Sequence, residues 1–229
     1  DRRARWTGKA RQGSRIVVIT CLAMGDVGHN RQGWADVRAA LPGCRLDWVV
    51  EQSFSAIPRL HADVGDVIPV SIRRWRKRPL AAATLGEFSA LRSRLRRTPY
   101  DAIIDTQGLL KSALLAWMAN GCSHGLDWKS SREPLRLFYD KVYAVPWSAH
   151  AVERNRMLAA NALGYAISSA PNYGIAAHAQ GLASLESLFP LQASGDFAVL
   201  LHATSAAEKE WPENDWIRLG AQLASLGMA

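Results

Sequence analysis

Short apolar runs rich in β-branched residues alternate along this chain with segments of helical periodicity. Four such runs are predicted strands, at residues 15–20, 45–50, 66–70 and 101–105. Helical patterns follow or separate them at residues 27–41, 83–97, 108–119 and 148–163. Strands joined by helices pair in parallel, with right-handed crossovers. The sequence therefore predicts an α/β fold built on a Rossmann-like parallel sheet.

A stretch rich in Ser, Pro, Asn and Gly follows the last of these helices and indicates a domain boundary. Residues 197–204 then read as a new buried strand, and residues 212–227 as a helix with Trp216, Leu219 and Leu223 on one stripe. One strand and one helix cannot bury their apolar faces alone, so we expect a second domain that is cut short. The expected organisation is a disordered leader or artefact at 1–14, a domain at 15–170, a linker at 171–195 and the start of a second domain at 196–229.

The net charge of +8 is concentrated in two segments. Residues 1–15 carry six basic side chains against one acidic, and residues 71–97 carry nine against Glu87, so the remainder is mildly acidic. Such patches attract phosphates on nucleic acid, lipid or sugar. The three cysteines are odd in number and far apart, which favours a reducing cytoplasm. No window approaches the ~18 consecutive apolar residues of a membrane span.

A lone carboxylate, Asp26, comes directly after the first predicted strand, behind Gly25. Ligands of open parallel sheets bind outside the carboxyl ends of the strands. The local pattern leaves two interpretations open, a helix cap and a catalytic base.

Polar side chains also follow a later strand, where Asp105, Gln107 and Lys111 stand at a strand end and on the first turns of a helix. Residues 124–134 read as a polar loop around Trp128 that shapes a binding edge, or as an ordinary surface loop. After the strand at 197–204, Thr204, Ser205 and Lys209 offer two hydroxyls and an ammonium that suit a diphosphate. The six histidines show no zinc spacing, so we predict no metal site.

A basic run at residues 72–79 reads as a loop, and the following helix at 83–97 is basic and amphipathic. Its apolar stripe consists of Leu85, Phe88, Leu91 and Leu95. A solvated charge run is the usual interpretation of such clusters. Together, however, the two segments suit an anionic membrane surface.

Seven segments together resemble the lipopolysaccharide heptosyltransferase I family, two-lobed glycosyltransferases of the GT-B kind in glycosyltransferase family 9. They are "MGDV.H" (24–29), "LDWVVE" (46–51), "IPVSIRRWRK" (68–77), "YDAIIDTQGLLKSAL" (100–114), "HGLDWKSSREP" (124–134), "HAVERNR" (150–156) and "LHATSAAEKEWPENDW" (201–216). The resemblance implies two Rossmann-like domains, of which the second is represented here by its first strand and helix.

The resemblance also implies an inverting transfer of L-glycero-D-manno-heptose from ADP-heptose to Kdo on Kdo2-lipid A, at the cytoplasmic face of the inner membrane. No cofactor is implied and no metal is strictly required. Asp26 matches the general base, and Thr204, Ser205 and Lys209 match the donor-phosphate contacts. The implied acceptor-binding residues are Arg73, Arg76, Lys77, Gln107, Lys111 and Arg132.

Two departures from the family pattern are visible. Gly28 and Gly33 interrupt the helix after Asp26, and each costs about 1 kcal/mol of helix propensity. The acidic-Gly-His motif of the family's second lobe is absent, so we expect this chain alone to bind ADP weakly and to turn over little. The alternatives are another two-lobed glycosyltransferase and a non-catalytic module that binds anionic surfaces or nucleic acid. No nucleic-acid motif supports the last of these, so no nucleic-acid partner is expected, and the sequence indicates no oligomeric state.

Overall fold

The computed structural model describes most of the chain in two separate compact units, residues 1–176 and 177–229. The described residues are 6, 8–21, 24–60, 64–168, 170, 198–202 and 207–228. The predicted linker at 171–195 lies outside them, so its extent stays a prediction. No helix of the described ranges is long and apolar enough to cross a bilayer.

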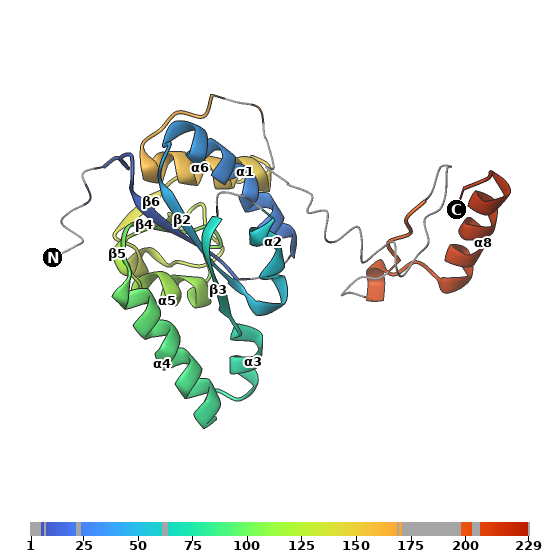
Figure 1. Ribbon diagram of the computed structural model, residues 1–229, viewed down its shortest axis with the longest axis horizontal. Helices are drawn as coiled ribbons and strands as arrows, with labels where there is room; N and C mark the ends of the chain where they lie inside the picture. Colours follow the sequence, from blue (N-terminus) through green and yellow to red (C-terminus); the bar gives the residue numbers. More distant parts are fainter. Residues whose placement is uncertain are drawn as a thin grey trace. The chain divides into compact units, whose positions relative to one another are not determined.

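The first unit is built on a six-stranded sheet with the order β3-β2-β1-β4-β5-β6 (Figure 1). Its strands are β1 (Arg15–Thr20), β2 (Arg45–Glu51), β3 (Val64–Val70), β4 (Pro99–Asp105), β5 (Asn120–Leu126) and β6 (Lys141–Tyr143). Every neighbouring pair is parallel. The strand order reverses between β1 and β4, which is where ligands bind in doubly wound sheets.

Helices cover both faces of this sheet (Figure 1). They are α1 (Met24–Ala40), α2 (Ala56–Arg59), α3 (Ile72–Lys77), α4 (Ala82–Arg97), α5 (Leu110–Met118) and α6 (Ala151–Leu163), with short 3-10 turns η2 (Gln52–Phe54) and η3 (Arg136–Phe138). Val18 and Trp48 pack into the core beneath α1 and α6, while Val17 and Ile19 belong to the core on the α4 and α5 side. Apolar side chains on both faces of β1 explain why its sequence is continuously hydrophobic.

All four predicted strands and all four predicted helices of this unit are confirmed, with end points that differ by a few residues. Two predictions were incomplete. The basic run at 72–79 is not a loop throughout, because Ile72–Lys77 form helix α3. The polar segment at 124–134 begins inside a strand, since His124–Leu126 end β5. Strand β6 carries no sequence signal, because it is three residues long.

The apolar stripe predicted on α4 is only half buried. Leu91 and Leu95 are in the core, but Leu85 and Phe88 are 55% and 40% exposed. The helix therefore continues beyond the sheet that its C-terminal half covers.

Helices α1 and α6 pack against each other, and Gly33 lies on the face of α1 that contacts α6. A Cβ on Gly33 would stand 3.9 Å from the backbone oxygen of Asn155 in α6, an ordinary van der Waals distance, so an alanine would also fit there. Val27, Trp34 and Val37 on the same helix are buried as the apolar stripe predicts. Trp34 meets Trp48 of β2 edge-to-face, at 5.7 Å between ring centroids.

A buried ion pair locks the same two helices. Arg156 of α6 donates from Nε and Nη2 to the two carboxylate oxygens of Asp36 in α1, at 2.6 and 3.1 Å. Both side chains are at most 5% exposed. The more exposed Glu153 accepts a further bond of 2.9 Å from Nη1 of Arg156.

Strand β3 is the outermost strand on its side of the sheet. Pro69, which has no N–H, faces Val50 in the register with β2. Asp66 of the same strand binds Arg94 of α4 at 2.6 Å.

The second unit contains η4 (Ala207–Lys209) and helix α8 (Glu213–Ser225) among its described residues. Trp216, Leu219 and Leu223 are partly buried on one stripe, so the predicted helix is confirmed. The predicted strand at 197–204 is not formed at residues 198–202. A strand requires hydrogen bonds to a neighbouring strand, and no described residue pairs with these five.

Replacing Asp36 by Ala should destabilise the first unit, because it removes the carboxylate to which the buried Arg156 guanidinium donates two hydrogen bonds. We expect a loss of about 3 to 5 kcal/mol in the free energy of unfolding, measured by urea denaturation. The matched control is Asp66→Ala, which breaks a half-exposed pair and should cost ~1 kcal/mol or less. Equal losses for both variants would contradict a stabilising role for the buried pair.

Candidate active site

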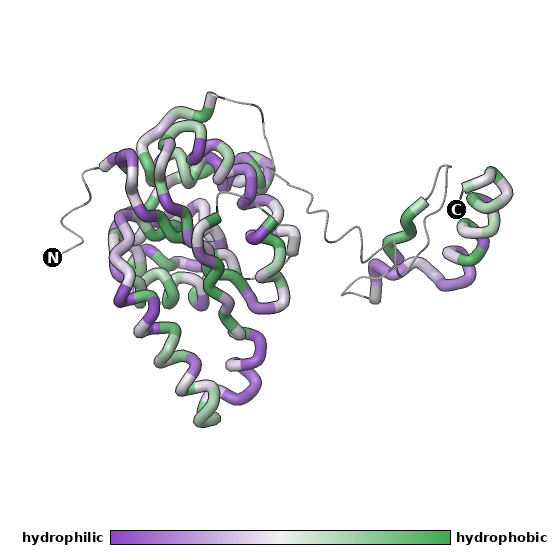
Figure 2. Tube along the Cα trace, viewed as in Figure 1, coloured by the Kyte–Doolittle hydropathy of each residue, from purple (hydrophilic) through white to green (hydrophobic). Residues whose placement is uncertain are grey.

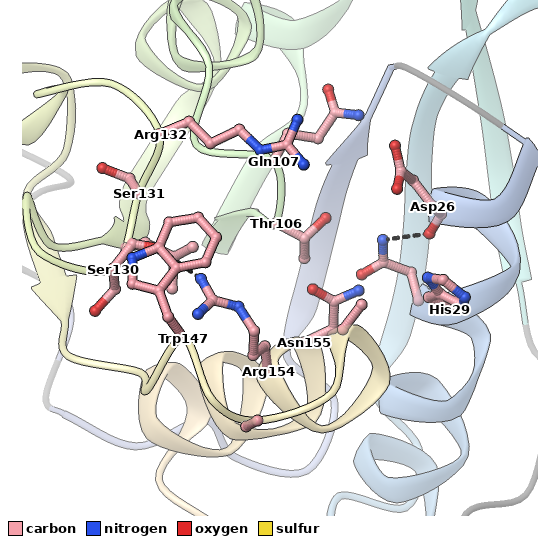
Figure 3. Close-up of a pocket in the computed structure, with 14 residues that line it drawn as sticks. Asp26, His29, Thr106, Gln107, Ser130, Ser131, Arg132, Trp147, Arg154 and Asn155 are labelled. Atoms are coloured by element: carbon pink, nitrogen blue, oxygen red, sulfur yellow. Dashed lines mark hydrogen bonds between the residues drawn. The ribbon is translucent and has the colours of Figure 1, made fainter.

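A cavity of about 280 Å³ opens at the carboxyl edge of the sheet, beside the point where the strand order reverses (Figure 3). Side chains from α1, from the segments that follow β4, β5 and β6, and from α6 line it. Those with polar groups are Asp26, His29, Asn30, Thr106, Gln107, Ser130, Ser131, Arg132, Trp147, Arg154 and Asn155. The lining therefore combines a carboxylate, two guanidinium groups and several neutral hydrogen-bonding groups.

Asp26 is the third residue of α1 and stands in its first turn, half-buried against the cavity. The helix begins before it, at Met24, so Asp26 is not the residue that caps the helix. Its charge still interacts favourably with the positive end of the helix dipole. Among the described residues, no hydrogen bond or ion pair engages its carboxylate, which leaves both oxygens available to a bound molecule.

Asn30 holds the start of this helix in place. Its side-chain amide donates to the backbone oxygen of Asp26 at 2.8 Å and to Oγ1 of Thr20, the last residue of β1, at 3.1 Å. Thr20 in turn lies 3.1 Å from Oγ1 of Thr106, which follows β4. The position of Asp26 is thus fixed relative to the ends of both central strands.

Gln107 also lines the cavity, and neither its amide oxygen nor its amide nitrogen has a hydrogen-bond partner within the described ranges, although both atoms are buried. Its backbone N–H donates to the carboxylate of Asp105 at 2.9 Å. Two buried atoms without partners are costly unless a bound molecule satisfies them. Gln107 is therefore suited to contact a ligand.

Asp105 anchors this turn from a fully buried position at the end of β4. Besides Gln107 N–H, it accepts a bond of 2.7 Å from the hydroxyl of Tyr139. Burial raises the pKa of Asp105 to about 6, and these hydrogen bonds oppose the rise. Tyr139 reaches the carboxylate only because residue 125 is Gly, since a Cβ there would lie 2.4 Å from the tyrosine ring.

Arg132 and Arg154 bring two positive charges to the cavity (Figure 3). Arg154 is tied to the protein: it donates to the backbone oxygens of Ser130 at 2.6 Å and Pro146 at 2.8 Å, and it lies 4.0 Å from the ring centre of Trp147. Burial, and after it the charge of Arg132, lower the pKa of Arg154. Arg132 is exposed, and no described residue forms a hydrogen bond or ion pair with it. An anion would relieve the repulsion between the two groups.

The other predicted acceptor-binding residues form a second group outside this cavity. Arg73, Arg76 and Lys77 belong to α3, whose first N–H groups are held by the buried Glu51 at 3.2 and 3.4 Å. The pKa of Lys111 in α5 is lowered by burial, and the positive charges of Arg76 and Arg73 lower it further. The negative charge of Glu51 opposes this effect, and Lys111 and the two arginines of α3 together form an electropositive region around it.

His124, the first residue of the segment predicted as a polar loop, is a core residue. Its Nδ1 lies 3.0 Å from the hydroxyl of Tyr143, and its ring contacts that of Trp6 edge-to-face. Burial lowers the pKa of His124 to about 4, so the ring is neutral near pH 7. Trp128 is 64% exposed and does not line the cavity. Arg132, the predicted site residue of this segment, does line it.

The predicted donor contacts are only partly described. Thr204 and Ser205 lie outside the described residues, and Lys209 is an exposed residue of η4. Across the described ranges, no group of three or more His, Cys, Asp or Glu side chains is arranged to hold a metal ion.

Sequence reasoning did not single out Asn30, Trp147 or Arg154. Asn30 stands four residues after Asp26 on the same helix, and this spacing places the two residues on one face, so the sequence could have indicated their contact. The roles of Trp147 and Arg154 depend on contacts with the loop at Ser130, and no local pattern predicts such contacts.

The comparisons with known proteins agree with one another. The sequence model of glycosyltransferase family 9 (heptosyltransferase) matches residues 88–229. Lipopolysaccharide heptosyltransferase 1 of Escherichia coli K12 is 44% identical over 217 residues, which are 93% of this chain and 66% of that protein. The chain thus spans slightly less than two thirds of the length of this relative.

Two solved structures of the E. coli heptosyltransferase WaaC are similar to this chain. One was determined with ADP and has a TM-score of 0.82 at 42% identity, covering 93% of this chain and 66% of the other. The second was determined with ADP-2-deoxy-2-fluoro heptose and has a TM-score of 0.83 at 43% identity, covering 93% and 67%. The predicted α/β architecture and the predicted family are confirmed.

His124 and Asp105 should give opposite pH dependences of stability. The pKa of His124 is about 4 in the folded state against an ordinary 6.5, so its contribution is complete above pH 6.5 and lost as the pH falls through 4. The pKa of Asp105 is about 6 against 3.8, so its contribution is complete below pH 3.8 and lost as the pH rises through 6. Between these limits the two effects oppose each other.

In His124→Phe the contribution of His124 is absent, so we expect the stability of this variant to fall between pH 4 and 6 as Asp105 loses its proton. The stability of wild type relative to this variant should rise by about 3 kcal/mol between pH 4 and 6.5. Urea denaturation at several pH values measures it, with Asp105→Asn as the variant that shifts the slope in the opposite direction. A pH-independent difference between wild type and His124→Phe would show that His124 titrates normally in the folded protein.

Proposed function

The chain belongs to glycosyltransferase family 9, the heptosyltransferases, and we propose that it serves in the transfer of L-glycero-D-manno-heptose from ADP-heptose to Kdo of Kdo2-lipid A. The observation that carries the proposal is the cavity at the sheet edge, where the carboxylate of Asp26, without a protein partner among the described residues, shares one space with Arg132. The relatives named above support the class of reaction.

In the proposed reaction, Asp26 takes the proton of an acceptor hydroxyl as that oxygen attacks the anomeric carbon of the heptose. The bond from this carbon to the diphosphate oxygen breaks, and ADP leaves with the electron pair. Attack from the face opposite the leaving group inverts the configuration. Such a transfer requires one base and a stabilised leaving group, in contrast to the paired carboxylates of glycoside hydrolysis. A carboxylate held by its backbone, with both oxygens available, suits the first of these roles.

The acceptor side of the proposal rests on charge. Kdo is a carboxylated sugar and the lipid A precursor is phosphorylated, so an acceptor of this kind carries several negative charges. Arg132 and Gln107 line the cavity beside Asp26, and Arg73, Arg76 and Lys111 form the electropositive region between α3 and α5. Lys77 adds an exposed ammonium on α3. We propose that these six side chains bind the acceptor.

The donor side rests on the relatives, since the E. coli structures were determined with ADP and an ADP-heptose analogue. We propose that Thr204, Ser205 and Lys209 contact the diphosphate, where charge develops as ADP departs. The proposal includes no cofactor and no strictly required metal, and it places the protein on the cytoplasmic face of the inner membrane.

Asp26→Asn should slow transfer strongly without weakening donor binding, because it removes the proton acceptor and keeps the shape of the side chain. We expect kcat to fall by about 10²- to 10⁴-fold. The measurement uses a chimera in which residues 1–229 are joined to the part of the E. coli relative that this chain does not cover. Steady-state kinetics of this chimera give kcat, and calorimetric titration gives its dissociation constant for ADP. The control is Glu153→Gln on α6, a carboxylate that does not line the cavity. Turnover by Asp26→Asn close to that of the parent would rule out its role as the base.

Lys209→Ala should weaken ADP binding by the chimera by ~1.5–3 kcal/mol, the usual contribution of a charged hydrogen bond. Arg218→Ala removes another cation of the second unit, one that already pairs with Asp215, and should leave the dissociation constant unchanged. Calorimetric titration with ADP compares the two variants. An unchanged dissociation constant for Lys209→Ala would contradict the proposed contact.

A further inference from the structure

The hairpin formed by α3 and α4 carries apolar side chains that the fold does not bury. Leu80, in the turn between the helices, is 86% exposed, and Leu85 and Phe88 in the first half of α4 are 55% and 40% exposed. The buried part of the α4 stripe ends at Leu91. Figure 1 shows that this hairpin projects from one end of the sheet.

Glu87 of α4 joins the two helices of the hairpin. Its carboxylate accepts two bonds from Arg74, at 3.0 and 2.6 Å, and one from the indole nitrogen of Trp75, at 2.7 Å. The ring of Trp75 also meets Phe88 edge-to-face, at 6.2 Å between centroids. Leu80 and Leu85 are therefore held outside by a defined structure.

Basic side chains flank the exposed leucines. Arg76, Lys77 and Arg78 are all exposed at the end of α3, directly before Pro79 and Leu80. In Figure 2 the hydrophilic α3 segment stands next to the paler and more hydrophobic end of the hairpin. An apolar tip beside a cluster of cations is the arrangement of peripheral proteins that bind anionic bilayers.

We propose that the tip of the α3–α4 hairpin inserts Leu80 and Leu85 into an anionic bilayer, with Arg78 on the lipid headgroups and with Arg76 and Lys77 next to them, where they meet the acceptor. The proposal rests on the proposed function in one respect, since a lipid-linked acceptor has to be reached at a membrane. The tip would dock the protein next to the electropositive region of α3, so a sugar that extends from the bilayer reaches the cations first.

A bilayer fits this tip better than a protein partner does. A stable protein interface buries about 800 Å² on each partner and excludes charge from its centre. The tip instead offers two leucines at its end, set beside three cations. A lipid surface satisfies both kinds of group at once, because acyl chains take up the leucines while the headgroups neutralise the cations.

The test is binding of the chain of residues 1–229 to vesicles of phosphatidylcholine with and without phosphatidylglycerol. These vesicles contain no Kdo, so binding to them does not depend on recognition of the acceptor sugar. We expect binding to the anionic vesicles that falls steeply with added salt, and a decrease of about tenfold or more for Leu80→Ser with Leu85→Ser. The matched control is Leu137→Ser, since Leu137 is 94% exposed on η3 of the same unit.

Insertion is separated from surface adsorption by a label at the tip. The described cysteines, Cys21, Cys44 and Cys122, are buried, so a Leu80→Cys variant labelled under native conditions reports mainly on position 80. The emission of an environment-sensitive dye there should shift to the blue on vesicles, whereas the same dye on Leu137→Cys should not respond.

Several results would overturn the proposal. They are vesicle binding unaffected by the two serines, an equal decrease for Leu137→Ser, and a dye that stays in water on bound protein. A dimer in sedimentation experiments that the two serines dissolve would identify a second copy of the chain as the occupant instead. Failure of the proposed function has a different signature, namely a chimera that binds these vesicles normally but transfers no heptose.

Discussion

The side-chain amide of Asn30 is the contact on which the candidate site depends. One NH₂ group donates to the backbone of Asp26 and to the hydroxyl of Thr20, and Thr20 touches Thr106 across the sheet. The first turn of α1 is thereby fixed to the ends of β1 and β4. Because these strands flank the point where the strand order reverses, a carboxylate in this turn necessarily faces the crevice where doubly wound sheets bind their ligands.

The charged groups around this crevice have different roles, and the hydrogen bonds that each one forms show which role it has. Arg154 donates hydrogen bonds to backbone oxygens and stacks on Trp147, so its role is to hold the wall of the cavity in place. Asp105 is buried and orders the turn of Gln107. Asp26 and Arg132 form no side-chain hydrogen bond or ion pair with the described residues, and both line the cavity. Chemistry with a bound molecule is therefore expected of the latter two.

Local sequence patterns predicted what depends on local chemistry. The β-branched runs predicted strands β1 to β4, and the helical stripes predicted the long helices. Strand β5 was missed because Gly, Ser and His carry no strand pattern, and its pairing with β4 and β6 compensates for this weakness. Helix α3 was missed because it shows no apolar stripe: most of its residues are basic, and Ile72 is its one buried side chain. The network of Thr20, Asn30 and Thr106 joins positions up to 86 residues apart, and only the fold brings them together. Family resemblance, in contrast, identified Asp26, Gln107 and Arg132 as site residues, and all three line one cavity.

The outer strand β3 has a consequence for how the protein behaves in a crowded solution. An exposed strand edge is a template on which another polypeptide can add as a further strand, which leads to aggregates. Pro69 lacks the amide hydrogen that such growth requires, and the pair of Asp66 with Arg94 sets charge beside the same edge. These two features are the kind by which natural sheets end at an edge strand without adding a further strand from another chain.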